Sequence, residues 1–144
     1  MTDTHQDQAP SSIIVIIFSA FLSATAFILA SFIPTALELP KENDLFEIFV
    51  GIISILFGIG FTTFVIKKIH RTTSFARIFV SGWMTALVMS LFVSIFYLVA
   101  FHQEWIPLEA ESDTVSIISV VILKYNALGM MFSSLIALIF KNNG

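Results

Sequence analysis

Four long apolar segments dominate this sequence, and they limit it to a fold whose helices cross a membrane. The segments cover residues 13–33, 45–66, 78–101 and 115–140. A helix of about 20 residues crosses the roughly 30 Å hydrocarbon core of a bilayer. Hydrophobic residues make up 57% of the chain and charged residues 12%, a composition outside the usual range of soluble domains. We therefore predict an all-α integral membrane four-helix bundle with short loops.

The remaining residues leave room for a single domain. Residues 1–12 are polar and form a predicted N-terminal tail, in which Ser11 and Ser12 are placed to cap the first helix. Residues 13–141 then form one transmembrane domain. A cleaved signal peptide is the alternative for the first segment, but the residues before it are acidic rather than basic and the segment is too long. The chain has no cysteine, which excludes disulfides and thiolate metal sites.

The basic and acidic residues are separated by loop. The connection at 67–77 holds four of the seven basic residues and no acidic one, whereas the connections at 34–44 and 102–113 are rich in carboxylates. Short loops rich in Lys and Arg stay in the cytoplasm during insertion, so both termini are predicted to be cytoplasmic. The residues expected to contact anionic lipid headgroups are Lys67, Lys68, Arg71 and Arg77.

Small side chains recur at about four-residue intervals in three of the segments, a pattern that lets membrane helices approach closely. The predicted helix-packing residues are Ser54, Gly58 and Thr62 in the second segment, Gly82, Ala86, Ser90 and Ser94 in the third, and Asn126, Gly129, Ser133 and Ala137 in the fourth. The third segment is predicted to be a central packing helix. Trp83 is expected at the membrane interface, where aromatic residues gather.

Lys124 is an ionisable residue well inside a predicted span. A lysine at the bilayer centre costs roughly 2.5–3.5 kcal/mol on insertion scales, so such residues often serve a function. By the helical rise, Lys124 lies about 13 Å from the start of its segment, and its flexible side chain can carry the charge toward the headgroups. Three interpretations stay open: an anchor at the interface, a structural ion pair with Glu47 as candidate partner, and a transport or proton-relay role.

The side of the fourth segment that carries Lys124 is predicted to face lipid. Lys124 points away from most of the small residues of its own helix, because successive residues are 100° apart. The large apolar residues on its side of the helix are Ile117, Val121, Leu128, Met131 and Leu135. Asn126, on the small side, is predicted to form hydrogen bonds between helices or to contact a partner protein, rather than to bind a substrate.

The sequence offers no residue set for catalysis or for a cofactor. His70 and His102 fall in different loops and His5 in the tail, so haem ligation within the membrane is not expected. No His, Asp and Glu spacing suits a metal, and no serine has the histidine and acid of a catalytic triad. A cation held by the acidic loops is a weaker alternative to a solvated surface. We predict a protein that is not an enzyme and has no cofactor.

The second half of the chain carries a set of features found together elsewhere. They are Lys67-Lys68 and Arg71, then Ser74-Phe75 followed by Gly82, then Pro107, and finally Ser134-Leu135-Ile136 with Lys141. In these features it resembles an uncharacterised family of small bacterial inner-membrane proteins with four spans, a domain of unknown function. The resemblance implies four helices in a bacterial inner (cytoplasmic) membrane and no particular activity.

These features together favour a small multi-pass membrane protein that works through helix contacts. We expect a non-enzymatic accessory or structural subunit whose partners are membrane lipids and either further copies of itself or other membrane proteins, and not nucleic acid. The alternative is a small transporter or channel that uses Lys124 and Asn126.

Overall fold

The computed structural model describes residues 8–38, 44–70, 74–105 and 114–141, and the regular structure in these ranges is helical. The long helices are α1 (Gln8–Ser31), α3 (Asp44–Ile69), α4 (Phe75–His102) and α5 (Thr114–Phe140), and a single turn, α2 (Ile33–Ala36), follows α1. Within the described residues, four helices are long and apolar enough to cross a membrane. The predicted all-α class with four such helices is confirmed.

The helix boundaries follow local chemistry. The first helix begins at Gln8, ahead of the expected start, so Pro10 falls in the first turn, where a missing N–H costs nothing. It ends at Ser31, because Pro34 would clash with the backbone of a helix that continued through it. Pro34 instead lies in the first turn of α2. Helix α4 begins after Ser74, whose Oγ accepts a hydrogen bond from the Arg77 N–H at 3.3 Å. Residues 1–7 of the predicted tail lie outside the described residues.

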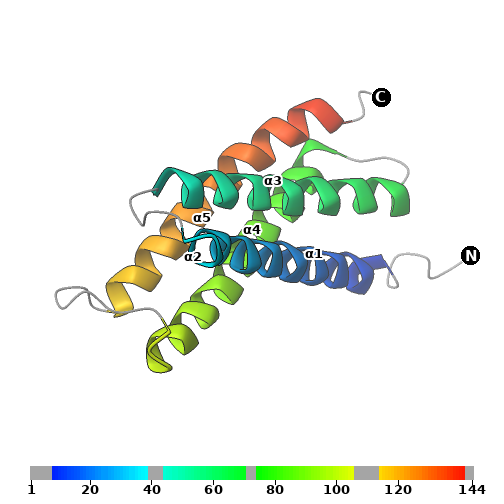
Figure 1. The fold of residues 1–144 in the computed structure, drawn as a ribbon. Helices are drawn as coiled ribbons and strands as arrows, with labels where there is room; N and C mark the ends of the chain where they lie inside the picture. Colours follow the sequence, from blue (N-terminus) through cyan, green and yellow to red (C-terminus); the bar gives the residue numbers. More distant parts are fainter. Residues whose placement is uncertain (1–7, 39–43, 71–73, 106–113, 142–144) are drawn as a thin grey trace, which may run out of the picture.

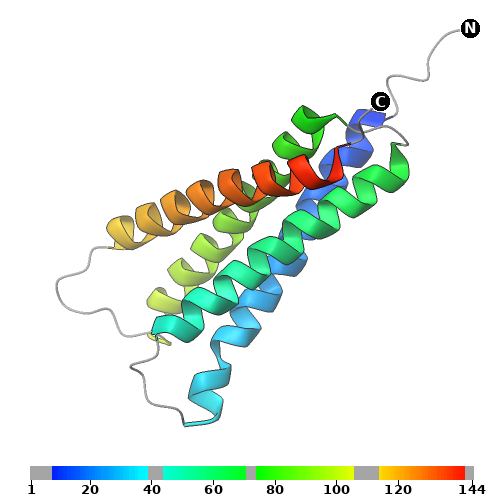
Figure 2. The same ribbon diagram turned by 90° about the horizontal axis from the view of Figure 1, so that it is seen from above.

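The long helices form two antiparallel pairs that pack across each other. Helices α1 and α3 lie side by side, as do α4 and α5, and the second pair crosses the first obliquely (Figure 1). Figure 2 shows the same two pairs from above. Helix α4 packs against α1, α3 and α5, whereas α5 packs chiefly on α4. The helix with the longest series of small residues is thus the one with the most extensive contacts to other helices.

The two ends of the bundle differ in charge. The start of α1, the end of α3, the start of α4 and the end of α5 share one end (Figure 1), where Ser12 Oγ lies 3.4 Å from His70 Nε2. We call this the basic end, defined by Lys67, Lys68, Arg77 and Lys141. The opposite end, the acidic end, is defined by the described carboxylates Glu38, Glu47 and Glu104.

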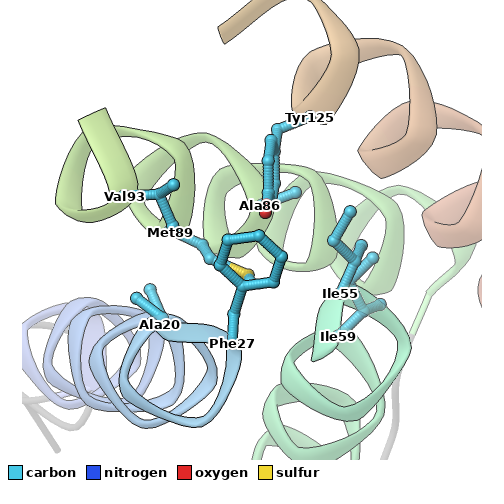
Figure 3. Close-up of a cluster of buried hydrophobic side chains, with 9 residues drawn as sticks. Ala20, Phe27, Ile55, Ile59, Ala86, Met89, Val93 and Tyr125 are labelled. Atoms are coloured by element: carbon cyan, nitrogen blue, oxygen red, sulfur yellow. The ribbon is translucent and has the colours of Figure 1, made fainter. Parts of the chain in front are cut away.

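The core lies where the two helix pairs meet. Figure 3 shows side chains of α1, α3 and α4 converging on the ring of Tyr125, which reaches in from α5. The buried cluster consists of Ala20, Ala24, Phe27, Ile55, Ile59, Ala86, Met89, Val93 and Tyr125. Several of these residues are alanines, so the backbones approach closely and two large rings fill the space that remains.

The outward surface of the bundle is apolar on every long helix. Leu29 on α1 is 65% exposed, Phe57 on α3 is 53% exposed and Ile139 on α5 is 73% exposed. Soluble monomers rarely present continuous apolar surface on this scale. Such a surface is what helices present to lipid.

Candidate functional site

Two glycines bring α4 and α5 into close contact. A Cβ atom on Gly129 would lie 2.5 Å from the Ala86 Cβ, and one on Gly82 would lie 2.7 Å from the Ser133 Oγ. These distances are well inside van der Waals contact, so a larger residue would force the helices apart. Gly82 also meets α3, because an added Cβ would lie 2.8 Å from Ile59 Cγ2. The absence of a side chain at Gly82 therefore allows α3, α4 and α5 to meet.

The other predicted packing residues of α4 and α5 are buried, with Asn126 only half-buried. Ser90, Ser94 and Ala137 are each at most 5% exposed. The two serine hydroxyls donate to carbonyls of their own helix, those of Leu87 at 2.6 Å and of Ser90 at 2.7 Å. Such bonds satisfy buried hydroxyls without a partner on another helix.

On α3 the predicted packing residues Ser54, Gly58 and Thr62 are also buried. Gly58 faces α1, where an added Cβ would lie 2.5 Å from the Ser23 Oγ. Thr62 Oγ1 lies 2.9 Å from Thr85 Oγ1 on α4. Because the Thr85 hydroxyl donates to the Ser81 carbonyl at 2.8 Å, Thr62 is the donor of the bond that joins α3 to α4.

Asn126 is joined to α4 by a hydrogen bond between side chains. The Trp83 Nε1–H donates to the Asn126 Oδ1 at 2.6 Å. The sequence alone places Trp83 among interfacial aromatics, whereas the structure gives its indole N–H a partner on another helix. In apolar surroundings an indole N–H and an amide without partners would each be costly, so this pair fixes the register of α4 against α5.

Lys124 lies on the outward side of α5 and is exposed, whereas the next residue, Tyr125, is only 4% exposed. The candidate partner Glu47 instead accepts a hydrogen bond from the Tyr97 hydroxyl at 3.0 Å. In the described part of the chain, no ion pair joins Lys124 to Glu47. The structure thus separates Lys124 from Asn126, since one faces outward and the other binds α4.

The side of α5 that carries Lys124 differs in part from the sequence prediction. Met131 and Leu135 are exposed at 50% and 51%. Val121 and Leu128, however, are half-buried and pack against the core, so the prediction that they face outward is wrong. Val121 lies four residues before the buried Tyr125 and Leu128 three residues after it, so both share the side of α5 that packs against the core.

A groove opens at the acidic end between α3, α4 and α5. It has a volume of about 350 Å³ and is lined by Glu47 and Tyr97, together with Ser116, Ile117, Val120 and Val121 of α5. The groove therefore combines one carboxylate and one phenol with an apolar wall. Among the described residues, no group of three or more His, Asp or Glu side chains could hold a metal ion.

Tyr125 is the main residue that sequence reasoning missed. Its ring packs edge-to-face against Phe27, with the ring centroids 6.2 Å apart (Figure 3). Its hydroxyl is buried and has no hydrogen-bond partner among the described residues. The buried stripe of α5 is Tyr125, Gly129, Ser133 and Ala137, not one that begins at Asn126. The strict four-residue spacing of these residues was the available signal.

A second set of packing residues that sequence reasoning missed lies on α1. Ser19, Ala20, Ser23 and Ala24 are each at most 2% exposed. Ser19 and Ser23 are four residues apart, and so are Ala20 and Ala24. This spacing of small side chains is the same signal that identified packing faces on the other helices. The face of α1 that meets α3 and α4 was therefore readable from the sequence.

At the basic end, the predicted lipid-contact residues lie in different surroundings. Lys68 and Arg77 are exposed, whereas Lys67 is half-buried. The Lys67 Nζ lies 5.4 Å from the centroid of the Phe140 ring, at the end of α5, a cation–π distance. Arg71 lies outside the described residues.

Comparison of the chain with protein-family models, with curated proteins and with solved structures found no match. The resemblance of the second half to a bacterial membrane family stays a prediction. The features of the molecule that bear on its function are therefore a closely packed interior, a charged residue on the outside of α5, and the groove at the acidic end.

Proposed function

We propose that this protein is a non-enzymatic membrane subunit that acts through contacts between α5 and the helices of other membrane proteins or of further copies of itself. The single observation that carries this proposal is the exposed position of Lys124 on a helix of 27 residues that carries no other charged side chain. We define the outward face of α5 by the exposed residues Val120, Leu123, Lys124, Ala127 and Met131.

Insertion into a membrane is the first part of the proposal. Its support is the length and apolar character of the long helices in the described residues, together with the apolar outward surface. In lipid, that surface is solvated by hydrocarbon, and close packing of small residues holds the helices together. In water, the same surface would cause aggregation.

The orientation and location are the second part. Lys67, Lys68, Arg77 and Lys141 gather at the basic end, and the positive-inside rule places such an end in the cytoplasm. The helix ends nearest both termini are at this end (Figure 1), so both termini would be cytoplasmic. The resemblance to a bacterial family favours the inner membrane.

Helix contact explains the exposed lysine better than transport does. A transport pathway would bring Lys124 and Asn126 to one polar route, but Lys124 faces outward while Asn126 accepts a hydrogen bond from Trp83. Close to Asn126 along α5, Gly129 lies directly against Ala86 of α4. A charged side chain on the outward face is costly in lipid, and an interface headgroup or a partner helix relieves that cost.

The experiment uses the cysteine-free chain. Single cysteines are introduced at Ala127 on α5 and at Phe57 on α3, which are both exposed and each 13 residues from the start of their helix. Each variant is labelled with a thiol-directed photo-crosslinker in native membranes. We expect A127C to give a defined product with a second copy or another membrane protein, whereas F57C at matched depth reacts with lipid.

Two results would count against the proposal. One is equal, diffuse labelling from A127C and F57C, which would mean that the outward face of α5 has no preferred neighbour. The other is a strictly monomeric protein in mild detergent together with a Lys124-dependent ion or solute flux in vesicles, which would favour the transporter.

A further inference from the structure

A second groove lies at the basic end, between the last turns of α3 and α5. Its volume is about 560 Å³, and its lining residues are Gly60, Thr63, Phe64, Lys67, Lys68 and Phe140. The groove is separate from the outward face of α5, and the contact of Lys67 with the Phe140 ring lies in its lining.

The polarity of this groove runs along the helix axis. Lys67 and Lys68 stand at its outer end, and Gly60 lies seven and eight residues earlier on the same face of α3, about 10–12 Å deeper. Phe64 lies between these positions, and Phe140 closes the opposite side. The groove is therefore cationic at the bundle end and apolar toward the bundle centre.

Among the described residues, nothing neutralises the charge of the two lysines. Within the described residues neither Lys67 nor Lys68 forms an ion pair, and the described carboxylates Glu38, Glu47 and Glu104 belong to the acidic end. Lys67 is half-buried, and the Phe140 ring that it approaches adds attraction but no negative charge. The outer end of the groove is thus suited to an anion.

Gly60 supplies an independent observation. A Cβ atom at Gly58, Gly82 or Gly129 would lie within 2.8 Å of another helix, but a Cβ at Gly60 meets nothing within 4 Å. Glycine inside a helix costs about 1 kcal/mol relative to alanine, and no contact of the described protein repays that cost at Gly60. The missing side chain instead deepens the apolar part of the groove, where a further molecule can lie against the helix.

We propose that this groove binds one anionic phospholipid, with its phosphate at Lys67 and Lys68 and an acyl chain along Gly60 and Phe64. The polarity of the groove is that of a lipid in one leaflet, charged at the surface and apolar toward the centre. A soluble phosphate compound matches only the cationic part, and an apolar helix matches only the deeper part. The inference rests on the membrane placement proposed above.

The test measures lipid binding to the intact protein, purified in mild detergent, by native mass spectrometry. Phosphatidylglycerol is compared with phosphatidylcholine, and glycerol phosphate serves as the soluble competitor. We expect phosphatidylglycerol to form a one-to-one complex with the protein. Phosphatidylcholine should bind less than phosphatidylglycerol does, and glycerol phosphate should not displace the bound phosphatidylglycerol. A wild-type protein that binds both lipids equally, or that loses the lipid to glycerol phosphate, would overturn the proposal.

Three variants locate the site. The double variant K67Q/K68Q should weaken phosphatidylglycerol binding roughly thirtyfold, because each basic residue near an anionic lipid contributes about 1 kcal/mol. The variant G60L should weaken it with all charges kept, because the new side chain fills the groove. The matched control R77Q removes an exposed charge at the same end, one expected to contact headgroups in general but lying outside the groove, so it should weaken binding far less than K67Q/K68Q does.

Each alternative has its own signature in these variants. If R77Q weakens binding as much as K67Q/K68Q, the attraction is general surface charge and the specific site is wrong. If G60L leaves lipid binding intact, or instead abolishes a wild-type dimer, the deep groove does not hold an acyl chain. A wild-type protein that inserts into vesicles and binds no lipid overturns this inference alone, whereas failure to insert overturns the proposed membrane placement as well.

Discussion

Helices α4 and α5 carry the same kind of small-residue repeat, yet they occupy different positions in the bundle. Both are described along their whole length, and ten residues of α4 are buried but only four of α5. The repeat identifies the face of a helix that packs, and it does not say how many neighbours that helix has. Helix α4 packs against α1, α3 and α5, whereas one side of α5 is left exposed. Lys124 lies on that exposed side.

The largest expected effect comes from breaking the point where α3, α4 and α5 meet. The substitution Gly82→Leu places a side chain where even a Cβ would lie 2.7 Å from Ser133 Oγ. Overpacking of this kind costs about 3 kcal/mol, so the free energy of unfolding should fall by that amount or the protein should fail to fold. Chemical unfolding in detergent micelles, followed by circular dichroism, measures the change.

The matched control for that experiment is Gly60→Leu. It makes the same substitution in a helix interior, but the added Cβ meets nothing within 4 Å. The control should unfold like the wild type or slightly later, because leucine favours helix more than glycine does. Equal loss of stability in both variants would show that the close approach of α4 to its neighbours is not what Gly82 provides.

A smaller effect is expected from the polar link between α4 and α5. Trp83→Phe and Asn126→Leu each remove one partner of a 2.6 Å hydrogen bond. Hydrogen bonds between membrane helices average about 0.6 kcal/mol and reach about 1.7 kcal/mol, and the half-buried pair should lie in that range. A double-mutant cycle on the free energy of unfolding measures the coupling, and strictly additive losses would mean that the two side chains do not interact.

The sequence predicted the helices better than it predicted their partners. Long apolar segments are sufficient to identify helices in a chain of this kind, because the backbone must satisfy its own hydrogen bonds in lipid. The four-residue repeats identified Gly82, Ala86, Gly129 and Ser133, all of which are buried. These are local properties, and local properties can be read from one stretch of chain.

The failures concern residues whose role depends on another helix. Tyr125 looks too large for a packing stripe, yet its ring is buried in a cluster that also contains Ala20, Ala24 and Ala86 of two other helices. Val121 and Leu128 look lipid-facing, but they flank Tyr125 on α5 and pack with it against residues of other helices. The hydrophobic period of one helix shows which of its faces packs. It does not show which residues of another helix, such as the alanines of the cluster, that face will meet.

A still smaller effect, of opposite sign, is expected at Tyr125. Its hydroxyl is buried without a hydrogen-bond partner among the described residues, and such a group destabilises the folded state by about 1 kcal/mol or more. Tyr125→Phe keeps the ring against Phe27 and should raise the free energy of unfolding by up to about 1 kcal/mol. If Tyr125→Phe instead lowers it, the hydroxyl has a partner in the membrane-embedded protein, such as bound water or a neighbouring subunit.

The smallest effect on folding is expected at Lys124, next to the buried Tyr125 on the same helix. Lys124 is exposed and makes no ion pair with a described residue, so Lys124→Leu should change the free energy of unfolding of the monomer by less than about 0.5 kcal/mol. The same substitution alters the centre of the outward face of α5, so it should change the photo-crosslinking of A127C to a neighbour. A substitution that unfolds the monomer would place Lys124 inside the packed bundle. One that leaves both folding and cross-linking unchanged would reduce Lys124 to an anchor that holds α5 at its height in the bilayer.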